Sequence, residues 1–98
     1  MKVEFAEERL TLIETIDAAK TGLPVAVINS FRDKFVIIRA ATDERVLRNW
    51  KSLHYENLEG YQDGRRSIRL NKQWRVVFTI NTECNPNKIR VLSVEDYH

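Results

Sequence analysis

Two β-strands joined by a short turn are predicted by the stretch Ser67-Ile-Arg-Leu-Asn-Lys-Gln-Trp-Arg-Val-Val-Phe-Thr-Ile80. Apolar and polar side chains alternate through residues 67–71, which is the period of a sheet with one buried face, and residues 74–80 are rich in β-branched and aromatic residues. Residues 89–94 have the same β-rich composition. Because the links between these segments are short and turn-like, we expect a three-stranded antiparallel meander.

The chain before this meander has mainly helical periodicity. Residues 2–5 alternate as a short strand, and residues 8–21 place Leu10, Ile13 and Ile16 three apart before Gly22 ends the pattern. These spacings predict an N-terminal strand followed by a first helix.

Two further helices are expected. Pro24 suits the start of a second helix, whose apolar residues recur at gaps of three and four: Ile28, Phe31, Phe35 and Ile38. Thr42 and Asp43 offer N-caps for a short third helix over residues 44–50, and residues 51–64 have the composition of a loop. The fold class is therefore α+β, in a single domain of residues 1–98 with an N-terminal strand, two to three helices and the meander.

Composition excludes several classes of protein. Hydrophobic residues make up 43% and charged residues 31% of the 98, as in ordinary globular chains. No apolar run approaches the roughly 20 residues that span a bilayer, and the acidic N-terminal segment does not resemble a secretory signal, so we expect a cytoplasmic protein without membrane contact. A single cysteine, Cys84, excludes an internal disulfide, and the two histidines show no metal-ligand spacing, so neither a metal nor a cofactor is expected.

Positive charge is concentrated in the middle of the chain. Residues 45–75 contain eight Lys/Arg against three Asp/Glu, whereas the flanking parts are slightly acidic. Such asymmetry is typical of a surface that meets a polyanion, which makes RNA or DNA the leading partner. Scattered solubilising charges are the alternative.

General acid–base cleavage of a phosphodiester matches the remaining polar residues. His54 and His98 are the two imidazoles, and their ordinary pKa of ~6.5 suits proton transfer near neutrality. Strand alternation places Arg69 and Arg75 on one face of the sheet, where guanidiniums bind phosphate. Aromatic side chains are available for stacking on bases, although a core position is the more usual one for a strand tryptophan; they are Tyr55, Tyr61, Trp74 and Tyr97.

Three segments together resemble a known family. They are Ser52-Leu-His-Tyr-Glu-Asn-Leu-Glu-Gly60, Ser67-Ile-Arg-Leu-Asn-Lys-Gln-Trp-Arg-Val-Val-Phe78 and the closing Val94-Glu-Asp-Tyr-His98. Over roughly residues 50–98 they are similar to the C-terminal half of HigB-type toxins of the RelE/ParE superfamily. The helical half is similar only in its general amphipathic pattern.

The resemblance implies a bacterial type II toxin. Such a toxin enters the ribosomal A site, cleaves the mRNA there without a metal, and is held inactive by a cognate HigA-like helix-turn-helix antitoxin, through which it associates indirectly with operator DNA. The catalytic residues implied are His54, Arg69, Arg75, Tyr97 and His98. The RNA-binding residues expected are Lys51, Arg65, Arg66, Asn71, Lys72 and Asp96.

The chain departs from the family pattern at one position, and two other functions are compatible with the sequence. Glu59 stands before Gly60 where many relatives carry a lysine, and this acid weakens the local phosphate site. Relatives with the same fold inhibit DNA gyrase without chemistry, and a non-enzymatic RNA-binding module would need only the basic middle. A terminal tail of Asp, Tyr and His favours the nuclease, because inhibition by binding has no need of acid–base groups.

Overall fold

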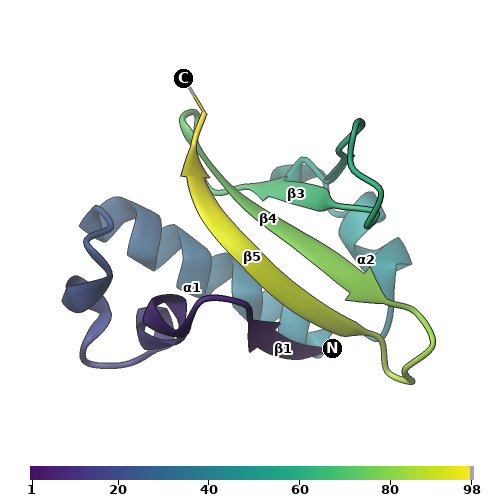
Figure 1. Ribbon diagram of the computed structural model, residues 1–98, viewed down its shortest axis with the longest axis horizontal. Coiled ribbons are helices and arrows are strands. Elements are labelled where there is room, and N and C mark those ends of the chain that lie inside the picture. Colours follow the sequence, from purple (N-terminus) through teal and green to yellow (C-terminus); the bar gives the residue numbers. More distant parts are fainter. Residues whose placement is uncertain (98) are drawn as a thin grey trace.

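A computed structural model describes residues 1–97, which form a twisted five-stranded sheet backed by a long helix (Figure 1). The strands lie in the order β1 (Lys2–Phe5), β5 (Lys88–Asp96), β4 (Trp74–Asn81), β3 (Arg66–Arg69) and β2 (Glu56–Asn57). β3, β4 and β5 are the expected antiparallel meander, and β1 joins its edge parallel to β5. The predicted α+β class and N-terminal strand are confirmed.

Two α-helices follow the sequence prediction closely. α1 (Val25–Ala40) begins directly after Pro24 and buries the four predicted residues, of which Phe31 and Phe35 stack with ring centroids 3.9 Å apart. α2 (Glu44–Asn49) begins after Asp43, whose side chain accepts a hydrogen bond from the Arg45 N–H. This contact satisfies one of the free amides of the first turn, as expected of an N-cap.

The prediction of a continuous first helix over residues 8–21 is wrong. The segment instead forms two 3₁₀ turns, η1 (Glu8–Glu14) and η2 (Ala18–Thr21). Thr15 donates its hydroxyl to the Leu12 carbonyl three residues back, as Thr11 does to Glu8, and such local bonds compete with α-helical ones. The spacing of three suits a 3₁₀ turn, so Leu10 and Ile13 are buried, whereas Ile16 lies beyond the end of η1 and is fully exposed.

The segment of residues 51–64 is more ordered than the predicted loop. It contains a short 3₁₀ turn, η3 (Lys51–Leu53), and then β2, which pairs with β3 at the far edge of the sheet. His54 links them with φ of 46°, a left-handed conformation that few residues other than glycine adopt. The expected loop therefore adds an edge strand to the meander.

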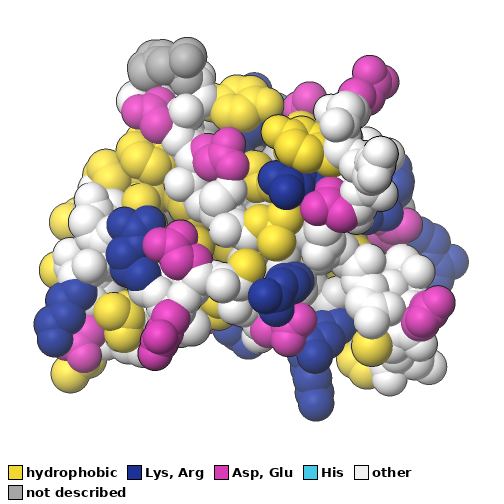
Figure 2. All heavy atoms as spheres, in the orientation of Figure 1, with side chains coloured by type: hydrophobic (Ala, Val, Ile, Leu, Met, Phe, Trp, Pro, Cys, Tyr) yellow, Lys and Arg dark blue, Asp and Glu magenta, His cyan; other side chains and the backbone are white. Residues whose placement is uncertain are grey.

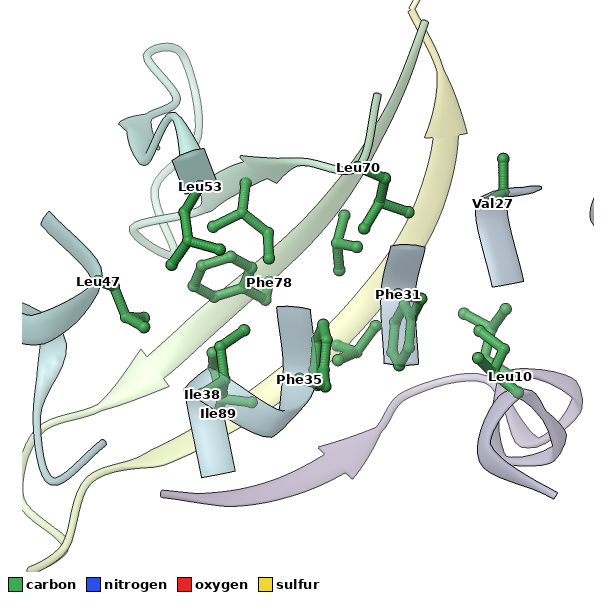
Figure 3. Close-up of a cluster of buried hydrophobic side chains, with 14 of the residues drawn as sticks. Leu10, Val27, Phe31, Phe35, Ile38, Leu47, Leu53, Leu70, Phe78 and Ile89 are labelled. Atoms are coloured by element: carbon green, nitrogen blue, oxygen red, sulfur yellow. The ribbon is translucent and has the colours of Figure 1, made fainter. Parts of the chain in front are cut away.

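The hydrophobic core lies between α1 and one face of the sheet (Figure 3). Leu70, Phe78 and Ile89 reach it from the sheet side, and Leu10, Val27, Phe31, Phe35, Ile38, Leu47 and Leu53 from the helical segments. Trp74 packs against this core, so the expectation that this tryptophan lies at the core is confirmed. We call the opposite face of β2–β5, which no helix covers in Figure 1, the open face. Among residues 1–97, no helix combines the length and the apolar composition needed to cross a membrane.

Candidate functional site

Strand register gathers polar side chains around Arg75 on the open face. Arg75 lies directly across from Arg69 on β3 and from Glu95 on β5, while Ser67 lies between Glu56 on β2 and Val77 on β4. Because directly paired residues share a face of a sheet, these side chains project to the same side, away from the core. The prediction that Arg69 and Arg75 share the open side is confirmed.

Arg75 is held by three contacts. Its Nη1 donates to Ser67 Oγ at 2.8 Å, its Nη2 lies 3.2 Å from Glu56 Oε2, and its guanidinium carbon lies 5.0 Å from the centroid of the Tyr97 ring. Only 8% of the residue is exposed. A guanidinium fixed in this way keeps its charge and a defined direction, since a planar fork loses little rotational freedom on binding.

An open groove of about 510 Å³ lies beside these groups. One wall is the β2 strand and the loop after it, with Glu56, Glu59 and Tyr61, and the other is the end of β5, with Glu95 and Tyr97. Tyr61 and Tyr97 are each about half exposed, so both rings are available to a ligand. The groove is thus bordered by two aromatic rings, with the Arg75 cluster next to it.

Charges of both signs are interspersed on this face, which Figure 2 shows toward the viewer. The basic character of residues 45–75 does not extend to the groove itself, because Glu56, Glu59 and Glu95 all line it. The acid at Glu59, noted in the sequence as a departure from the family, faces the same groove as Glu56 and Glu95.

The turn between β3 and β4 anchors the end of β5. Asn71 Oδ1 accepts hydrogen bonds from the amides of Gln73 and Trp74, which closes the turn. Gln73 in turn donates its side-chain amide to Asp96 Oδ2 at 2.9 Å and accepts the Tyr97 N–H at its carbonyl. Asn71 and Asp96 are therefore engaged in holding Tyr97 over Arg75.

Arg65 and Arg66 point to different surroundings. Arg65 pairs with Asp63 at 3.0 Å and stacks on Tyr61 at the rim of the groove, with 4.4 Å to the ring centroid. Arg66 lies on the helix side, where its Nε is 3.3 Å from Glu44 Oε2 on α2. The two neighbours are thus not equivalent, because successive side chains of a strand project to opposite faces.

Tyr55 belongs to the same helix-side cluster as Arg66. Its hydroxyl donates to Glu44 Oε2 at 2.9 Å, the Arg48 guanidinium lies over its ring, and its other neighbour is the core residue Phe78. Burial, reinforced by the hydrogen bond to Glu44, raises the pKa of Tyr55 to about 12. Tyr55 therefore supports the fold here and is not a stacking surface in the groove.

Three other predicted residues lie away from the groove. Lys51 and His54 are exposed at and after η3, and Lys72 is exposed in the β3–β4 turn. None of the three lines the groove beside Arg75. His98, to which the sequence assigns proton transfer, lies outside the described residues.

Glu56 and Glu95 line the groove and Ser67 holds Arg75 beside it, and sequence reasoning singled out none of the three as a site residue. Glu56 belongs to a two-residue strand inside a segment rich in Asn and Gly, too short for an alternation signal. The register that brings Glu56 and Ser67 to Arg75 is a tertiary property. Only the alternation of residues 67–71 pointed to Ser67, as part of a polar face with Arg69.

This arrangement brings together groups that suit a phosphodiester. A carboxylate at Glu56 can accept a proton, Arg75 with Arg69 can stabilise added negative charge on phosphate, and two exposed tyrosines can stack on bases. Within residues 1–97, no group of three or more His, Cys, Asp or Glu side chains is placed to hold a metal ion.

Comparison with known proteins identifies the family. Residues 3–98 match the model of the HigB-like toxins, described as the RelE-like toxin of type II toxin–antitoxin system HigB. The chain belongs to the HigB family of RelE-like toxins. Toxin HigB-1 of Vibrio cholerae serotype O1 is 33% identical over 94 residues, which cover 90% of this chain and 99% of the relative.

Solved structures show the same fold for this HigB-type toxin. The YoeB/ParE toxin from Agrobacterium tumefaciens superimposes with a TM-score of 0.60 at 14% identity, covering all of both chains. YoeB from Staphylococcus aureus, solved as a dimer, gives 0.59 at 19% identity and covers 97% of that chain. As a toxin of a type II system, this chain has an antitoxin as its partner.

Proposed function

We propose that this HigB-type toxin is an endoribonuclease that cleaves mRNA on the ribosome and so inhibits translation. The observation that carries the proposal is the setting of Arg75, held by Ser67, Glu56 and Tyr97 beside a groove with exposed aromatic rings. A fixed guanidinium next to a carboxylate supplies charge stabilisation and a proton acceptor within one site.

The proposed reaction uses the 2′-hydroxyl of the message as nucleophile. Glu56 accepts its proton while the 2′-oxygen attacks the adjacent phosphorus, and Arg75 with Arg69 stabilises the charge on the phosphorane oxygens. His98, next along the chain from Tyr97, donates a proton to the departing 5′-oxygen. These assignments give the proton-acceptor role to Glu56 rather than to His54, which does not line the groove.

The remaining residues are proposed to bind the message. Tyr97 and Tyr61 stack on bases that the ribosome presents unpaired. Phosphate contacts come from the exposed Lys51 and Lys72 and from the partly exposed Arg65 at the rim of the groove. A message on the ribosome as substrate implies action in the cytoplasm. We assign neutralisation to a HigA-like helix-turn-helix antitoxin, which also brings the toxin to operator DNA.

Mapping of new message ends tests the proposal. Purified toxin is added to a translating ribosome–mRNA system, with naked mRNA in a parallel lane. We expect cuts in phase with the codons only where ribosomes are present. Intact message in every lane would contradict the proposal and would make DNA supercoiling by gyrase the next assay.

Two arginines of the same sheet provide a matched control. Arg75→Gln should reduce the cleavage rate by about 10² or more, the usual cost of losing one preorganised charge contact. Arg90→Gln removes an exposed arginine of β5 whose partner is Glu4 on β1, and should leave the rate within about twofold. Equal rates for both variants would show that Arg75 is not catalytic.

Truncation before His98 tests the tail. A nuclease should lose cleavage while its ribosome binding persists, because the tail then supplies a proton and little of the binding surface. A toxin that works by binding alone should keep its effect after the same truncation.

A further inference from the structure

A polar cluster behind the sheet lies outside the groove and has no role in the reaction described above. Glu44 Oε2 on α2 receives the Tyr55 hydroxyl at 2.9 Å and lies 3.3 Å from Arg66 Nε and 3.5 Å from Arg48 Nη2. The Glu44 side chain is 24% exposed, so one largely shielded carboxylate accepts a hydrogen bond from Tyr55 and lies within ion-pair distance of two guanidinium groups. We call Glu44, Arg48, Tyr55 and Arg66 the rear cluster.

The rear cluster and the Arg75 cluster are joined by adjacent residues. Tyr55 directly precedes Glu56, and Arg66 directly precedes Ser67. Glu56 and Ser67 are also directly paired between β2 and β3. Because successive side chains of extended chain project to opposite sides, one residue of each pair binds Glu44 behind the sheet and the next binds Arg75 in front.

β2 depends on such anchors. It is two residues long, and its pairing with β3 is extended only by the bond from the Leu58 N–H to the Arg65 carbonyl at 2.9 Å. An edge strand this short has little stability of its own. Tyr55 fixes the chain immediately before β2 by packing on Phe78 and by its hydrogen bond to Glu44.

We infer that Glu44 is a positioning residue: by holding Tyr55 and Arg66 behind the sheet, it sets Glu56 and Ser67 at the distances that orient Arg75 in front. The inference rests on the proposed function for its catalytic consequence. Its structural part, the coupling of Glu44 to Arg75 across the β2–β3 pair, stands apart from any activity.

Single-turnover cleavage of ribosome-bound message tests the catalytic consequence. Glu44→Ala should lower the cleavage rate constant roughly 10- to 100-fold with ribosome affinity unchanged, because small misplacements of catalytic groups have effects of this size. Tyr55→Phe keeps the ring on Phe78 and removes only the donor, so it should fold normally and show a smaller loss in the same constant. A full rate in Tyr55→Phe together with a full rate in a folded Glu44→Ala would overturn the inference.

Glu14→Ala is the matched control. Glu14 pairs with Arg39 across η1 and α1, and its side chain is 28% exposed, close to that of Glu44. The pair lies away from the groove, so its loss tests a general cost of removing a shielded carboxylate. We expect Glu14→Ala to lower thermal stability by an amount similar to Glu44→Ala while leaving the cleavage rate constant unchanged. A matching fall in that constant would assign the Glu44 effect to stability alone.

A double-mutant cycle separates positioning from an independent contribution. If Glu44 acts through Arg75, adding Glu44→Ala to Arg75→Gln should lower the cleavage rate constant almost no further, because the guanidinium that Glu44 helps to orient is already absent. Losses that multiply would show that Glu44 acts by another route.

An NMR measurement separates failure of this inference from failure of the proposed function. The Arg75 side-chain Nε–Hε signal should be sharp in the wild type and in Glu14→Ala, and shifted or exchange-broadened in Glu44→Ala and Tyr55→Phe. If the wild type cleaves no message yet this signal responds as expected, the proposed function fails and the coupling stands. An unchanged signal in both rear-cluster variants would refute the coupling whatever the activity.

Discussion

Among individual residues, side chains of one type have different surroundings according to the face of the sheet that they occupy. Arg75 is nearly buried and bound by Ser67 and Glu56, whereas Arg66, also shielded, is bound to Glu44 behind the sheet. Tyr97 lies over a guanidinium at the groove, whereas Tyr55 packs on the core. Residue type alone therefore does not predict where a side chain lies in this chain; its contacts show its position.

The ring of Tyr97 rather than its hydroxyl should matter for cleavage. Tyr97→Phe preserves the stack on Arg75 and a surface for a base, so the rate should stay within about threefold. Tyr97→Ala should cost roughly tenfold or more, since base–aromatic stacking contributes about 1–3 kcal/mol. Single-turnover rates of the two variants check this, and equal losses would point to the hydroxyl instead.

The titration of Tyr55 should be visible in stability at alkaline pH. Because its pKa is raised from 10.0 to about 12 in the folded protein, the folded state retains a proton that the unfolded chain loses. The resulting stabilisation is fully present below pH 10 and is lost as the pH rises toward 12. The free energy of unfolding, measured with urea, should therefore fall more steeply with pH for the wild type than for Tyr55→Phe between pH 10 and 12. Parallel plots of this free energy against pH would contradict the prediction.

At the level of helices and strands, side-chain hydrogen bonds reinforce short pieces of backbone. β2 is anchored through Tyr55, and the end of β5 is anchored through Gln73 in the β3–β4 turn. η1 and η2 take the place of a regular helix because threonine hydroxyls occupy nearby carbonyls. Local hydrogen bonding of this kind overrides an amphipathic pattern when the pattern is short.

Two isoleucines of the same sequence pattern should differ in their contribution to stability, because η1 buries one of them and ends before the other. Ile13→Ala should destabilise the protein by about 2–4 kcal/mol, because Ile13 is fully buried in the core. Ile16→Ser should cost less than about 0.5 kcal/mol, because Ile16 is fully exposed. Free energies of urea unfolding check both values. A large loss of stability in Ile16→Ser would contradict the exposed position of Ile16 and favour the continuous helix.

At the scale of the whole molecule, one face of the sheet packs on the core and the other carries the Arg75 cluster and the groove. α1 covers the first face, which leaves β2–β5 open on the second. The arginines of residues 45–75 divide between these sides, since Arg69 and Arg75 lie on the open face and Arg66 pairs with Glu44 behind the sheet. The net charge of this segment therefore overstates the positive charge on the open face.

Replacing Arg65 or Arg66 by alanine should have different effects, because the two side chains lie on opposite sides of the sheet. Arg65→Ala should weaken ribosome binding and reduce the slope of log affinity against log salt by about one, as expected for a lost phosphate contact. Arg66→Ala should leave that slope unchanged and lower the free energy of unfolding by roughly 1–3 kcal/mol, since it removes a shielded partner of Glu44. Binding measured over a salt series, together with urea unfolding, distinguishes them, and equal salt slopes would contradict the assignment.

The class of fold and the faces of the strand around residues 67–71 could be predicted from the sequence alone. Alternation over residues 67–71 placed Ile68 and Leu70 on one face and Arg69 on the other, and Arg75 was expected to share the side of Arg69, as the structure confirms. The apolar spacing of α1 and the Asp43 cap were equally readable. These features rest on interactions within a few residues along the chain, which a local pattern records.

The composition of the groove could be seen only in the folded chain. Glu56 and Glu95 reach Arg75 through the pairing of strands distant in sequence, and β2 is too short to leave a pattern of its own. The same holds for Arg66, which appeared to be one of a basic pair until α2 brought Glu44 against it. Register and packing bring such residues together because they depend on the sum of contacts across the whole chain, which no short stretch of sequence contains.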